Sequence, residues 1–341
     1  MLYGGEGVRY LGRVMQGKNK ILRVLSGIQP SGKLHLGNYF GMMKPAIELQ
    51  ATGEAFYFIA NYHALTTVTD AVQLRAATRD VALDFLACGL DPARAVFFRQ
   101  SDVPEVTELT WLLSTVTPMG LLERCHSYKD KTARGIPANH ALFAYPVLMA
   151  SDILAYQSNL VPVGRDQKQH VEVTRDIAIK FNHQFGDIFT IPEPVIRENV
   201  AVVPGIDGQK MSKSYDNHLE LFGTEKDTKA RVMRIVTDST PLEAPKNPDT
   251  CNVFALYRLV ATEVQTQEMA GRYRAGGFGY GDAKKALFAV LWDYLAPLRA
   301  KRQELERDMA GVEAILTAGA ARARGEARRT LDAARKAMGL D

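Results

Sequence analysis

Short apolar runs alternate with longer helical patterns along the first half of the chain, and this alternation limits the possible folds more than any other feature. The apolar runs have the length and the branched or aromatic content of buried strands, and they cover residues 21–25, 55–60, 95–98 and 160–163. Helical patterns accompany them, over residues 37–50, 71–88, 146–157 and 166–181. Strands that alternate with helices predict an α/β fold with a parallel sheet, which binds ligands at the carboxyl ends of its strands.

The second half of the chain has a different pattern. After Ser214 helical stretches follow one another, over residues 226–236, 253–265, 283–307 and 311–338. Because 341 residues exceed the usual size of one domain, we expect two. The α/β domain should cover residues 21–215 and an all-helical domain residues 216–310, while the helix at about 311–338 could pack back on the first. The basic side chains of that last helix predict a solvated face, formed by Arg322, Arg324, Arg328, Arg329, Arg335 and Lys336.

Charge, cysteine content and the N-terminal sequence exclude some classes of protein. Subtracting 38 acidic from 42 basic side chains leaves a net charge of +4, which permits a nucleic-acid partner without requiring one. Cys88, Cys125 and Cys251 are far apart and odd in number, so neither a disulfide framework nor a zinc site is indicated. Residues 1–20 lack the apolar run of a signal peptide and are interpreted as an N-terminal extension. We expect a cytoplasmic protein with no membrane partner.

The first candidate binding motif joins the first predicted strand to the first predicted helix. Residues 27–38 read Gly-Ile-Gln-Pro-Ser-Gly-Lys-Leu-His-Leu-Gly-Asn, and the small residues allow the backbone to approach a ligand closely. A helix N-terminus adds amide donors for an anion. Many glycine-rich turns are only connectors, but His35 and Asn38 add further donors at neighbouring positions. The motif is typical of a phosphate site.

The second motif is the loop Lys210-Met211-Ser212-Lys213-Ser214, downstream of a turn at residues 205–208. Two flexible cations, Lys210 and Lys213, suit a triphosphate whose negative charge grows on the leaving pyrophosphate. A loop of lysine and serine alone is most often a solvated turn. Together with the first motif it indicates a clamp on ATP.

The two motifs together resemble the signature sequences of class I aminoacyl-tRNA synthetases, which are His-x-Gly-Asn or His-x-Gly-His and Lys-Met-Ser-Lys-Ser. Three segments extend the resemblance to the bacterial tryptophanyl-tRNA synthetases, namely residues 26–32, 145–154 and 161–170. The likeness runs from about residue 20 to the end of the chain. It implies a catalytic domain with a Rossmann-like parallel sheet, followed by a helical domain on the side of the tRNA anticodon.

The resemblance implies a two-step reaction. L-tryptophan reacts with ATP to give tryptophanyl-adenylate and pyrophosphate, and the tryptophan is then transferred to the 3′ end of tRNA(Trp). Such chemistry needs positioning and charge stabilisation but no nucleophilic side chain. By resemblance the catalytic groups are His35, Asn38, Lys210, Lys213 and a loop lysine that corresponds to Lys131, with Lys129 as its neighbour. ATP, carrying Mg²⁺ with it, would contact Gln29, Gly37, Asn38, Asp166, Lys210, Met211, Lys213 and Ser214.

Selectivity for tryptophan depends on the indole ring, whose N–H can only donate and therefore requires an acceptor. Asp152 matches the family residue that accepts from this N–H. Tyr145, Gln167 and Gln29 match positions at the amino and carboxylate end of the substrate, while Met149, Val161 and Val163 match apolar walls. His63 follows a predicted strand and is a further candidate. The chain departs from the family at Arg165 and Asn61, where Glu and Asp are common, and at His35, where Thr is common.

Alternative functions remain open at this point. A tyrosine-specific enzyme of the same superfamily would share the fold and both phosphate motifs, although Asp152 and residues 161–170 argue against it. A catalytically silent RNA-binding or regulatory paralogue would not need intact phosphate motifs. An adenylyltransferase that makes a small-molecule amide would leave the long helical part without a purpose. The resemblance favours a homodimer that binds tRNA(Trp), ATP and L-tryptophan.

Overall fold

The computed structural model describes residues 22–125, 139–164, 167–195 and 203–340. The expected extension at residues 1–20 lies outside these ranges, as do Lys129, Lys131, Arg165 and Asp166.

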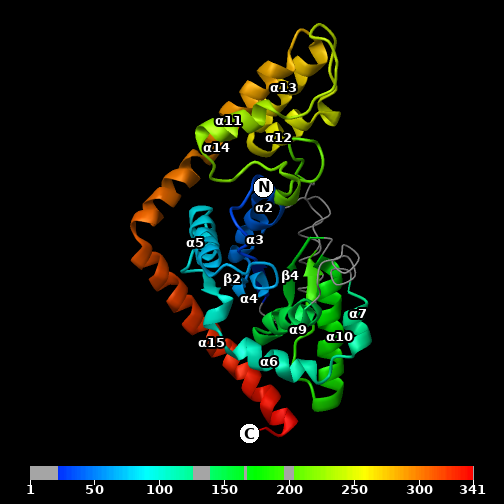
Figure 1. Cartoon of the computed structure of the whole chain (residues 1–341), viewed down its shortest axis with the longest axis vertical. Coiled ribbons are helices and arrows are strands. Elements are labelled where there is room, and N and C mark those ends of the chain that lie inside the picture. The colour runs from blue at the N-terminus through cyan, green and yellow to red at the C-terminus, as the bar shows by residue number, and fades with distance from the viewer. Residues whose placement is uncertain (1–21, 126–138, 165–166, 196–202, 341) are drawn as a thin grey trace.

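A five-stranded parallel sheet forms the centre of the molecule (Figure 1). Its order is β3-β2-β1-β4-β5, so the direction of strand addition reverses between β1 and β4. The strands are β1 (Arg23–Ile28), β2 (Glu54–Ile59), β3 (Ala95–Arg99), β4 (Leu160–Pro162) and β5 (Glu193–Val195). The four predicted strands are present within a few residues of the predicted bounds, and β5 is an additional short strand. A reversal of this kind opens a crevice at the carboxyl ends of the two strands, where ligands bind in open α/β sheets.

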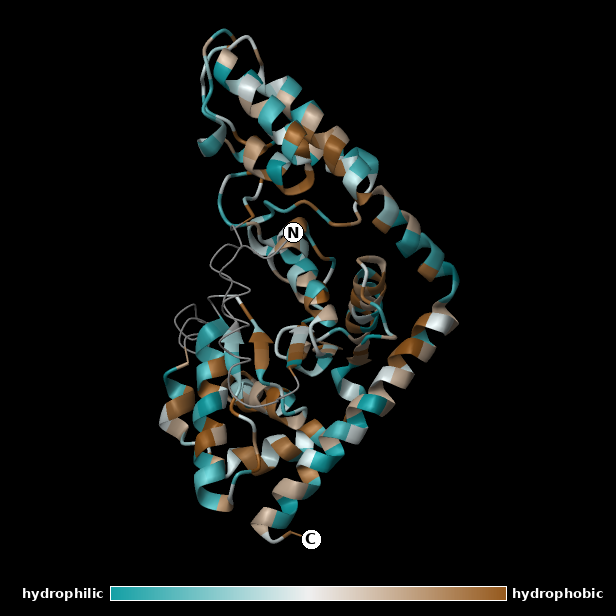
Figure 2. Cartoon of the chain, turned by 180° about the vertical axis from the view of Figure 1, so that it is seen from behind, coloured by the Kyte–Doolittle hydropathy of each residue, from teal (hydrophilic) through white to brown (hydrophobic). Residues whose placement is uncertain are grey.

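Both faces of the sheet are buried, as the nearly continuous apolar strands require. On β2 the side chains alternate between two hydrophobic clusters, because successive residues of a strand point to opposite faces. Tyr57 packs with Phe85 and Phe97 on one side, while Phe56 and Phe58 belong to the cluster on the other side. Figure 2 shows hydrophobic residues in the central strands and mixed hydrophobic and hydrophilic residues along the long C-terminal helix.

The helices around the sheet are α5 (Ala71–Ala87), α6 (Glu105–Ser114), α7 (Met119–Glu123), α9 (His140–Ala155), α10 (Lys168–Phe185) and the short α4 (Asn61–Ala64). Helix α9 begins six residues before the predicted start at Pro146, because the side chain of Asn139 caps it by accepting from the N–H of Leu142. The predicted helix 37–50 is divided into α2 (Leu36–Asn38), a π-helical segment (Tyr39–Met43), α3 (Lys44–Glu48) and a 3₁₀ turn (Leu49–Ala51).

The second half is helical in the described residues, with α11 (Glu225–Met233), α12 (Asn252–Val260), α13 (Glu263–Ala275), α14 (Tyr280–Arg307) and α15 (Met309–Met338). The predicted helix 253–265 is helical in both parts but is not one helix, because Ala261 is extended and Thr262 caps a new helix. The prediction that the basic residues of α15 form a solvated face holds for Arg328 and Arg329, which are mostly exposed. It also holds for Arg322, Arg324 and Lys336, which are exposed, although Arg322 bonds to a backbone oxygen of β3 and Arg324 bonds to Glu105 of α6. Arg335 is half-buried and pairs with α6. None of the described helices combines the length and apolar content that a membrane span needs.

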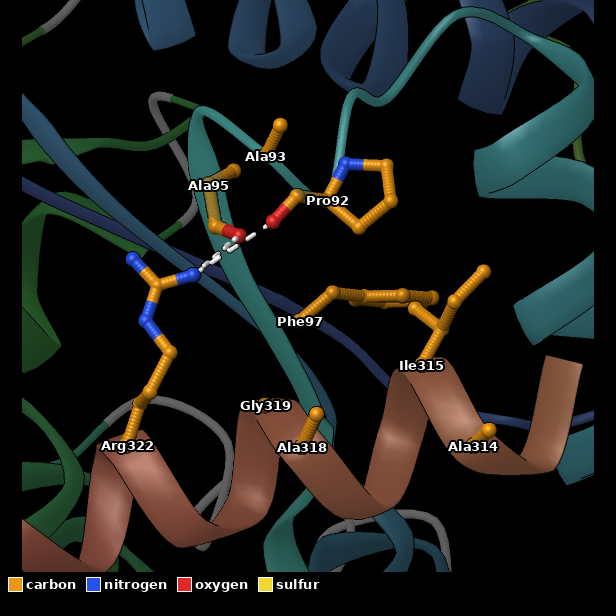
Figure 3. A pocket seen from close by; sticks show the side chains of 9 residues that line it. All are labelled: Pro92, Ala93, Ala95, Phe97, Ala314, Ile315, Ala318, Gly319 and Arg322. Carbon is orange, nitrogen blue, oxygen red and sulfur yellow. Dashed lines mark hydrogen bonds between the residues drawn. The ribbon is translucent and has the colours of Figure 1, made fainter. Parts of the chain in front are cut away.

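Helix α15 runs along the outer edge of β3, which pairs with no further strand in the described residues (Figures 1 and 3). Leu316 and Ala320 of this helix belong to the hydrophobic clusters of opposite sheet faces, so the helix covers the edge. At Gly319 the helix is so close that a Cβ atom would overlap the carbonyl oxygen of Phe97. A shallow pocket of about 410 Å³ remains beside this contact, and Arg322 reaches across it to the carbonyl oxygens of Pro92 and Ala95 (Figure 3).

Candidate active site

A cavity of about 390 Å³ lies at the carboxyl ends of β1 and β4, at the point where the strand order reverses. Its walls come from β1, from the segment after β2, from α9 and from β4. The lining residues are Leu25, Ser26, Gly27, Gln29, Met42, Phe58, Ala60, His63, Thr66, Tyr145, Met149, Asp152, Ile153, Val161, Pro162, Val163, Gly164 and Gln167. All six residues expected to bind tryptophan are among them, and so is Gln29.

Asp152 is the buried charged group of this cavity, with 2% of its surface exposed. Helix α9 carries it on the face that packs against the sheet. Burial raises the pKa of its carboxyl group, and hydrogen bonds from His63 and Gln100 oppose that rise. The Nε2 atom of His63 lies 2.8 Å from Oδ2 of Asp152, and the amide nitrogen of Gln100 lies 2.9 and 2.8 Å from its two oxygens. A buried carboxylate needs such donors in order to remain charged.

Gln100 was missed in the sequence, although it follows β3 directly and therefore stands at the ligand edge of the sheet. It is 1% exposed and belongs to no motif. His63, a weaker candidate, does line the cavity and contacts Asp152. His63 was named because it follows a predicted strand, and the same reasoning applied to the next strand would have found Gln100.

The other end of the cavity is polar. The hydroxyl group of Tyr145 lies 2.5 Å from Nε2 of His170, and the amide of Gln29 donates to the carbonyl oxygen of His63 at 3.0 Å. Gly27 leaves the backbone of β1 open to the cavity, because a Cβ at this position would overlap the ring of Phe58. A larger residue in place of Gly27 would therefore collide with Phe58, which also lines the cavity.

His35 and Asn38 form a reciprocal pair in the first motif. Nδ1 of His35 accepts from the N–H of Asn38 at 3.2 Å, and Oδ1 of Asn38 accepts from the N–H of His35 at 3.1 Å. Since Nδ1 is an acceptor, the ring proton is on Nε2. Burial, followed by the charges of Lys213 and His218, lowers the pKa of His35 to about 4. His35 is therefore a neutral hydrogen-bond donor at pH 7.

The lysine loop contacts the first motif. Nζ of Lys213 donates to the carbonyl oxygen of Ser31 at 3.2 Å, and burial lowers its pKa. Met211 is buried, and its sulfur accepts from the N–H of Gly37 at 3.3 Å. Lys210 and Ser214 are exposed. The structure thus brings the two motifs together, although they are more than 170 residues apart in sequence.

Asn217 bonds to the lysine loop and was not identified from the sequence. It is 1% exposed. Its Oδ1 accepts from the N–H of Ser212 at 2.7 Å, and its Nδ2 donates to Asp207 at 2.8 Å and to the carbonyl oxygen of Lys210 at 3.1 Å. A side chain that bonds both ends of a loop restricts the loop to few conformations. Asn217 lies just outside the five-residue motif, so the motif alone did not identify it.

Other candidates lie elsewhere. Lys131, Asp166 and Arg165 are outside the described residues. Asn61, a departure from the family, does not line the cavity but is paired with Ser101, donating to its hydroxyl group at 2.7 Å and accepting from its N–H at 3.0 Å. This residue links the ends of β2 and β3.

Comparison with known proteins gives the family. Residues 17–296 match the model described as tRNA synthetases class I (W and Y). The chain is 57% identical to the tryptophan–tRNA ligase of Rhodopirellula baltica, over 94% of this chain and 100% of that protein. It is 54% identical to the tryptophan–tRNA ligase of Fusobacterium nucleatum, over 93% of this chain and 98% of that protein.

Solved structures agree with this result. The tryptophanyl-tRNA synthetase of Campylobacter jejuni complexed with ADP and tryptophan is 49% identical to this chain, with a TM-score of 0.89. The match covers 94% of this chain and 100% of that one. The chain therefore belongs to the class I tRNA synthetases of the tryptophan and tyrosine (W and Y) family.

Proposed function

We propose that this chain activates L-tryptophan with ATP, releasing pyrophosphate, and transfers the tryptophan to tRNA(Trp). The observation that carries the choice of tryptophan is the buried carboxylate of Asp152 on the cavity wall. Two relatives that are 57% and 54% identical to this chain are named tryptophan–tRNA ligase, and the chain matches nearly their whole length.

The cavity suits an indole ring. Met149, Ile153 and Val161 provide apolar surface for the bicyclic ring, and Asp152 provides the acceptor that its N–H requires. Because the donors around Asp152 favour its charged form, an amino acid without an N–H at this position would leave a buried acceptor without that hydrogen bond. A site built for a substrate hydrogen bond rejects analogues that lack it by about 10⁴ to 10⁵ in rate ratio. The polar end with Tyr145, Gln167 and Gln29 would hold the α-amino and carboxylate groups.

The first step is an attack by a carboxylate oxygen of the amino acid on the α-phosphorus of ATP. A new P–O bond forms while the bond to the bridging oxygen of the β-phosphate breaks, and the electron pair leaves with pyrophosphate. Lys210 and Lys213 would bind the β- and γ-phosphates as charge develops there. His35 and Asn38 would donate to phosphate oxygens. Gly37, Met211, Ser214 and Asp166 would contact the rest of the nucleotide, and Lys131 would add a further cation.

Several broader expectations belong to the same proposal. Mg²⁺ would be bound by phosphate oxygens of ATP, and within the described residues no group of three or more His, Cys, Asp or Glu side chains could hold a metal ion. The catalytic part would cover residues 21–215 and the anticodon-side part residues 216–310. The enzyme would act in the cytoplasm as a homodimer. The free state of Cys88, Cys125 and Cys251 is consistent with a reducing compartment.

Charging of purified tRNA(Trp) tests the proposal. The wild-type chain is expected to attach tryptophan to this tRNA in the presence of ATP and Mg²⁺, and to attach neither tyrosine to it nor tryptophan to tRNA(Tyr). Attachment of tyrosine to tRNA(Tyr) would show a tyrosine enzyme. Binding of tRNA without attachment of either amino acid would show a silent paralogue.

A further inference from the structure

Gln100 connects the acceptor Asp152 to the backbone of the neighbouring strand end. It is the first residue after β3 and lies one strand away from the cavity, of which it is not a lining residue. Its side chain reaches Asp152 on α9, 52 residues along the chain. With 1% of its surface exposed, the side chain is shielded from water on all sides.

The backbone determines which way the amide of Gln100 points. Its Oε1 accepts from the N–H of Tyr62 at 3.0 Å and from the N–H of His63 at 3.4 Å. Backbone N–H groups can only donate, so the oxygen must face them and the NH₂ group must face Asp152. Glutamine is therefore held in one orientation by α4, and its amide nitrogen lies within hydrogen-bond distance of both carboxylate oxygens.

The contacts of the described residues leave Asp152 one acceptor position. A carboxylate offers about four lone-pair sites, two on each oxygen. Gln100 uses one site on Oδ1 and one on Oδ2, and Nε2 of His63 uses the second site on Oδ2. The remaining site is on Oδ1. Because an ionised carboxylate only accepts, His63 must be the donor in its contact.

We infer that Gln100 is a positioning residue for amino-acid selectivity, which holds Asp152 charged and oriented so that a single acceptor site is left for the indole N–H. This inference rests on the proposed function and adds to it a residue that touches no substrate. The inference requires that Gln100 affect the hydrogen bond between Asp152 and the indole N–H, and not merely the stability of the turn between β3 and α6.

Two substitutions separate these roles. Gln100→Glu keeps the oxygen that accepts from the backbone of Tyr62 and His63, so the turn stays anchored, but it replaces the NH₂ group by an oxygen. Gln100→Leu removes both functions. Ser101→Ala is the matched control, because Ser101 lies in the same turn and bonds to Asn61 instead of Asp152.

The measurement is ATP–pyrophosphate exchange with tryptophan and with β-(3-benzothienyl)alanine, in which sulfur replaces the indole N–H. The ratio of the two kcat/KM values is measured at pH 6 and pH 8, since the ratio cancels titrations that affect both substrates. We expect Ser101→Ala to keep the wild-type ratio. Gln100→Leu should lower the ratio by about tenfold or more, mainly through the KM for tryptophan and with little change in the KM for ATP.

The two variants should respond to pH in opposite directions. Without the amide donor the pKa of Asp152 rises, so in Gln100→Leu the carboxyl group gains a proton as pH falls and the ratio should be lower at pH 6 than at pH 8. In Gln100→Glu the introduced carboxyl group can donate as glutamine does while it is protonated, so the ratio should be closer to wild type at pH 6 and fall at pH 8. Among the ionisable groups, His63 on α4 contacts Asp152, Tyr156 at the end of α9 interacts with Asp152, and Glu105 on α6 interacts with Tyr156. All three are unchanged in both variants.

Each outcome decides the inference. Ratios within twofold of wild type in Gln100→Glu at both pH values would overturn it, even if the thermal midpoint falls, because the residue would then only anchor the turn. If Gln100→Leu does not fold, Gln100→Glu decides alone. Failure of the proposed function is a separate result, since the wild-type chain would then show no tryptophan-dependent exchange.

Discussion

At the scale of single residues, charge and burial divide the site into two parts. His35 is buried and neutral, Lys213 is a half-buried cation whose pKa is lowered by burial, and both belong to the two motifs that we propose bind ATP. Asp152 is a buried acid whose pKa is raised, and it belongs to the cavity. The lysine would act on ATP, whereas the aspartate would act on the amino acid.

Replacing Lys213 by alanine should therefore affect the reaction rate and not the binding of tryptophan. We expect the kcat of tryptophan-dependent pyrophosphate exchange to fall by about 10²- to 10³-fold, because one group that stabilises charge in the transition state is lost. The Kd for tryptophan, measured by calorimetry without ATP, should stay within about twofold. Lys180→Ala, an exposed lysine on α10, is the control and should change neither quantity. A collapse of tryptophan binding in Lys213→Ala would show that the clamp is wrongly assigned.

The sequence predicted the residues that belong to contiguous motifs. His35, Asn38 and Lys213 became candidates because they lie in signature sequences of the family, and Asp152 became a candidate because it matches a family position. Gln100 and Asn217 were missed because their importance depends on partners brought near by the fold. Gln100 meets Asp152 across 52 residues, and a spacing rule does not describe such a contact.

At the scale of secondary-structure elements, the packing of α15 on β3 depends on one glycine. Gly319 has no space for a Cβ, which would overlap the backbone of Phe97 (Figure 3). Arg99 at the end of β3 also binds Glu313 at the start of α15, and Arg324 of α15 binds Glu105 of α6. The helix is thus held at several points, and it cannot move away from β3 at Gly319 without disturbing these pairs.

Gly319→Ala should destabilise the protein even though alanine favours helix. Overpacking against a backbone costs about 1–3 kcal/mol, which exceeds the gain of up to about 1 kcal/mol in helix propensity. Gly325→Ala in the same helix is the matched control, because its Cβ would meet nothing within 4 Å. Urea unfolding should show a loss of stability for Gly319→Ala and a small gain for Gly325→Ala. Equal gains in both variants would contradict the close approach of α15.

Element types were predicted better than element ends. The buried strands are distinct in the sequence because they are apolar on both faces. The start of α9 was predicted at Pro146, yet the helix is capped by Asn139, begins six residues earlier and has the proline inside it. The break before α13 was readable, since Thr262 and Gln265 form a capping box. The short strand β5 contains Pro194 and has too few residues to give a pattern.

At the scale of the whole molecule, Arg302 joins the helical part to the sheet. This residue of α14 binds Asp80 and Asp84 of α5 at 2.7 Å, and it also pairs with Glu306. Asp84 is buried, and burial raises its pKa to about 6 despite the opposing charge of Arg302. Helix α14 also packs on α11 and α12, and α5 packs on β2 (Figure 1). The ion pairs of Arg302 with Asp80 and Asp84 therefore connect those helices to the sheet through α5.

Arg302→Met should destabilise the protein more at pH 8 than at pH 5. The folded pKa of Asp84 lies above its unfolded value, so its ionisation lowers stability as pH rises through about 4 to 6. Without Arg302 the folded pKa rises further, and a buried charge is left unpaired at pH 8, at a cost of about 3 kcal/mol or more. At pH 5 Asp84 is largely protonated and the cost is smaller. Thermal unfolding at both pH values checks this difference.

Arg307→Met, at the exposed end of the same helix, is the control for Arg302→Met and should have a small effect that does not depend on pH. An equal loss of stability at pH 5 and pH 8 in Arg302→Met would show that Asp84 does not require the arginine as a counter-charge.

The whole-molecule arrangement also explains how the motifs meet. Backbone hydrogen bonds from Leu36 to Leu219 and from Leu221 to Leu34 tie the first motif to the chain that follows the lysine loop. The sequence predicted an α/β part followed by helices, because strand and helix periodicities differ. The sequence indicated that the helix at about 311–338 could pack back on the α/β part. It could not predict that this helix covers the edge of β3, since that depends on contacts between residues more than 200 positions apart.

The central claim is that the lysine loop determines the reaction and Asp152 determines the amino acid. The most direct test is ATP–pyrophosphate exchange by the wild-type chain and by Asp152→Asn, each with tryptophan and with tyrosine. We expect exchange by the wild type with tryptophan only, and a fall of about 100-fold or more in kcat/KM for tryptophan in Asp152→Asn with little change in the KM for ATP. Exchange by the wild type with tyrosine alone, or an unchanged kcat/KM for tryptophan in Asp152→Asn, would contradict the account.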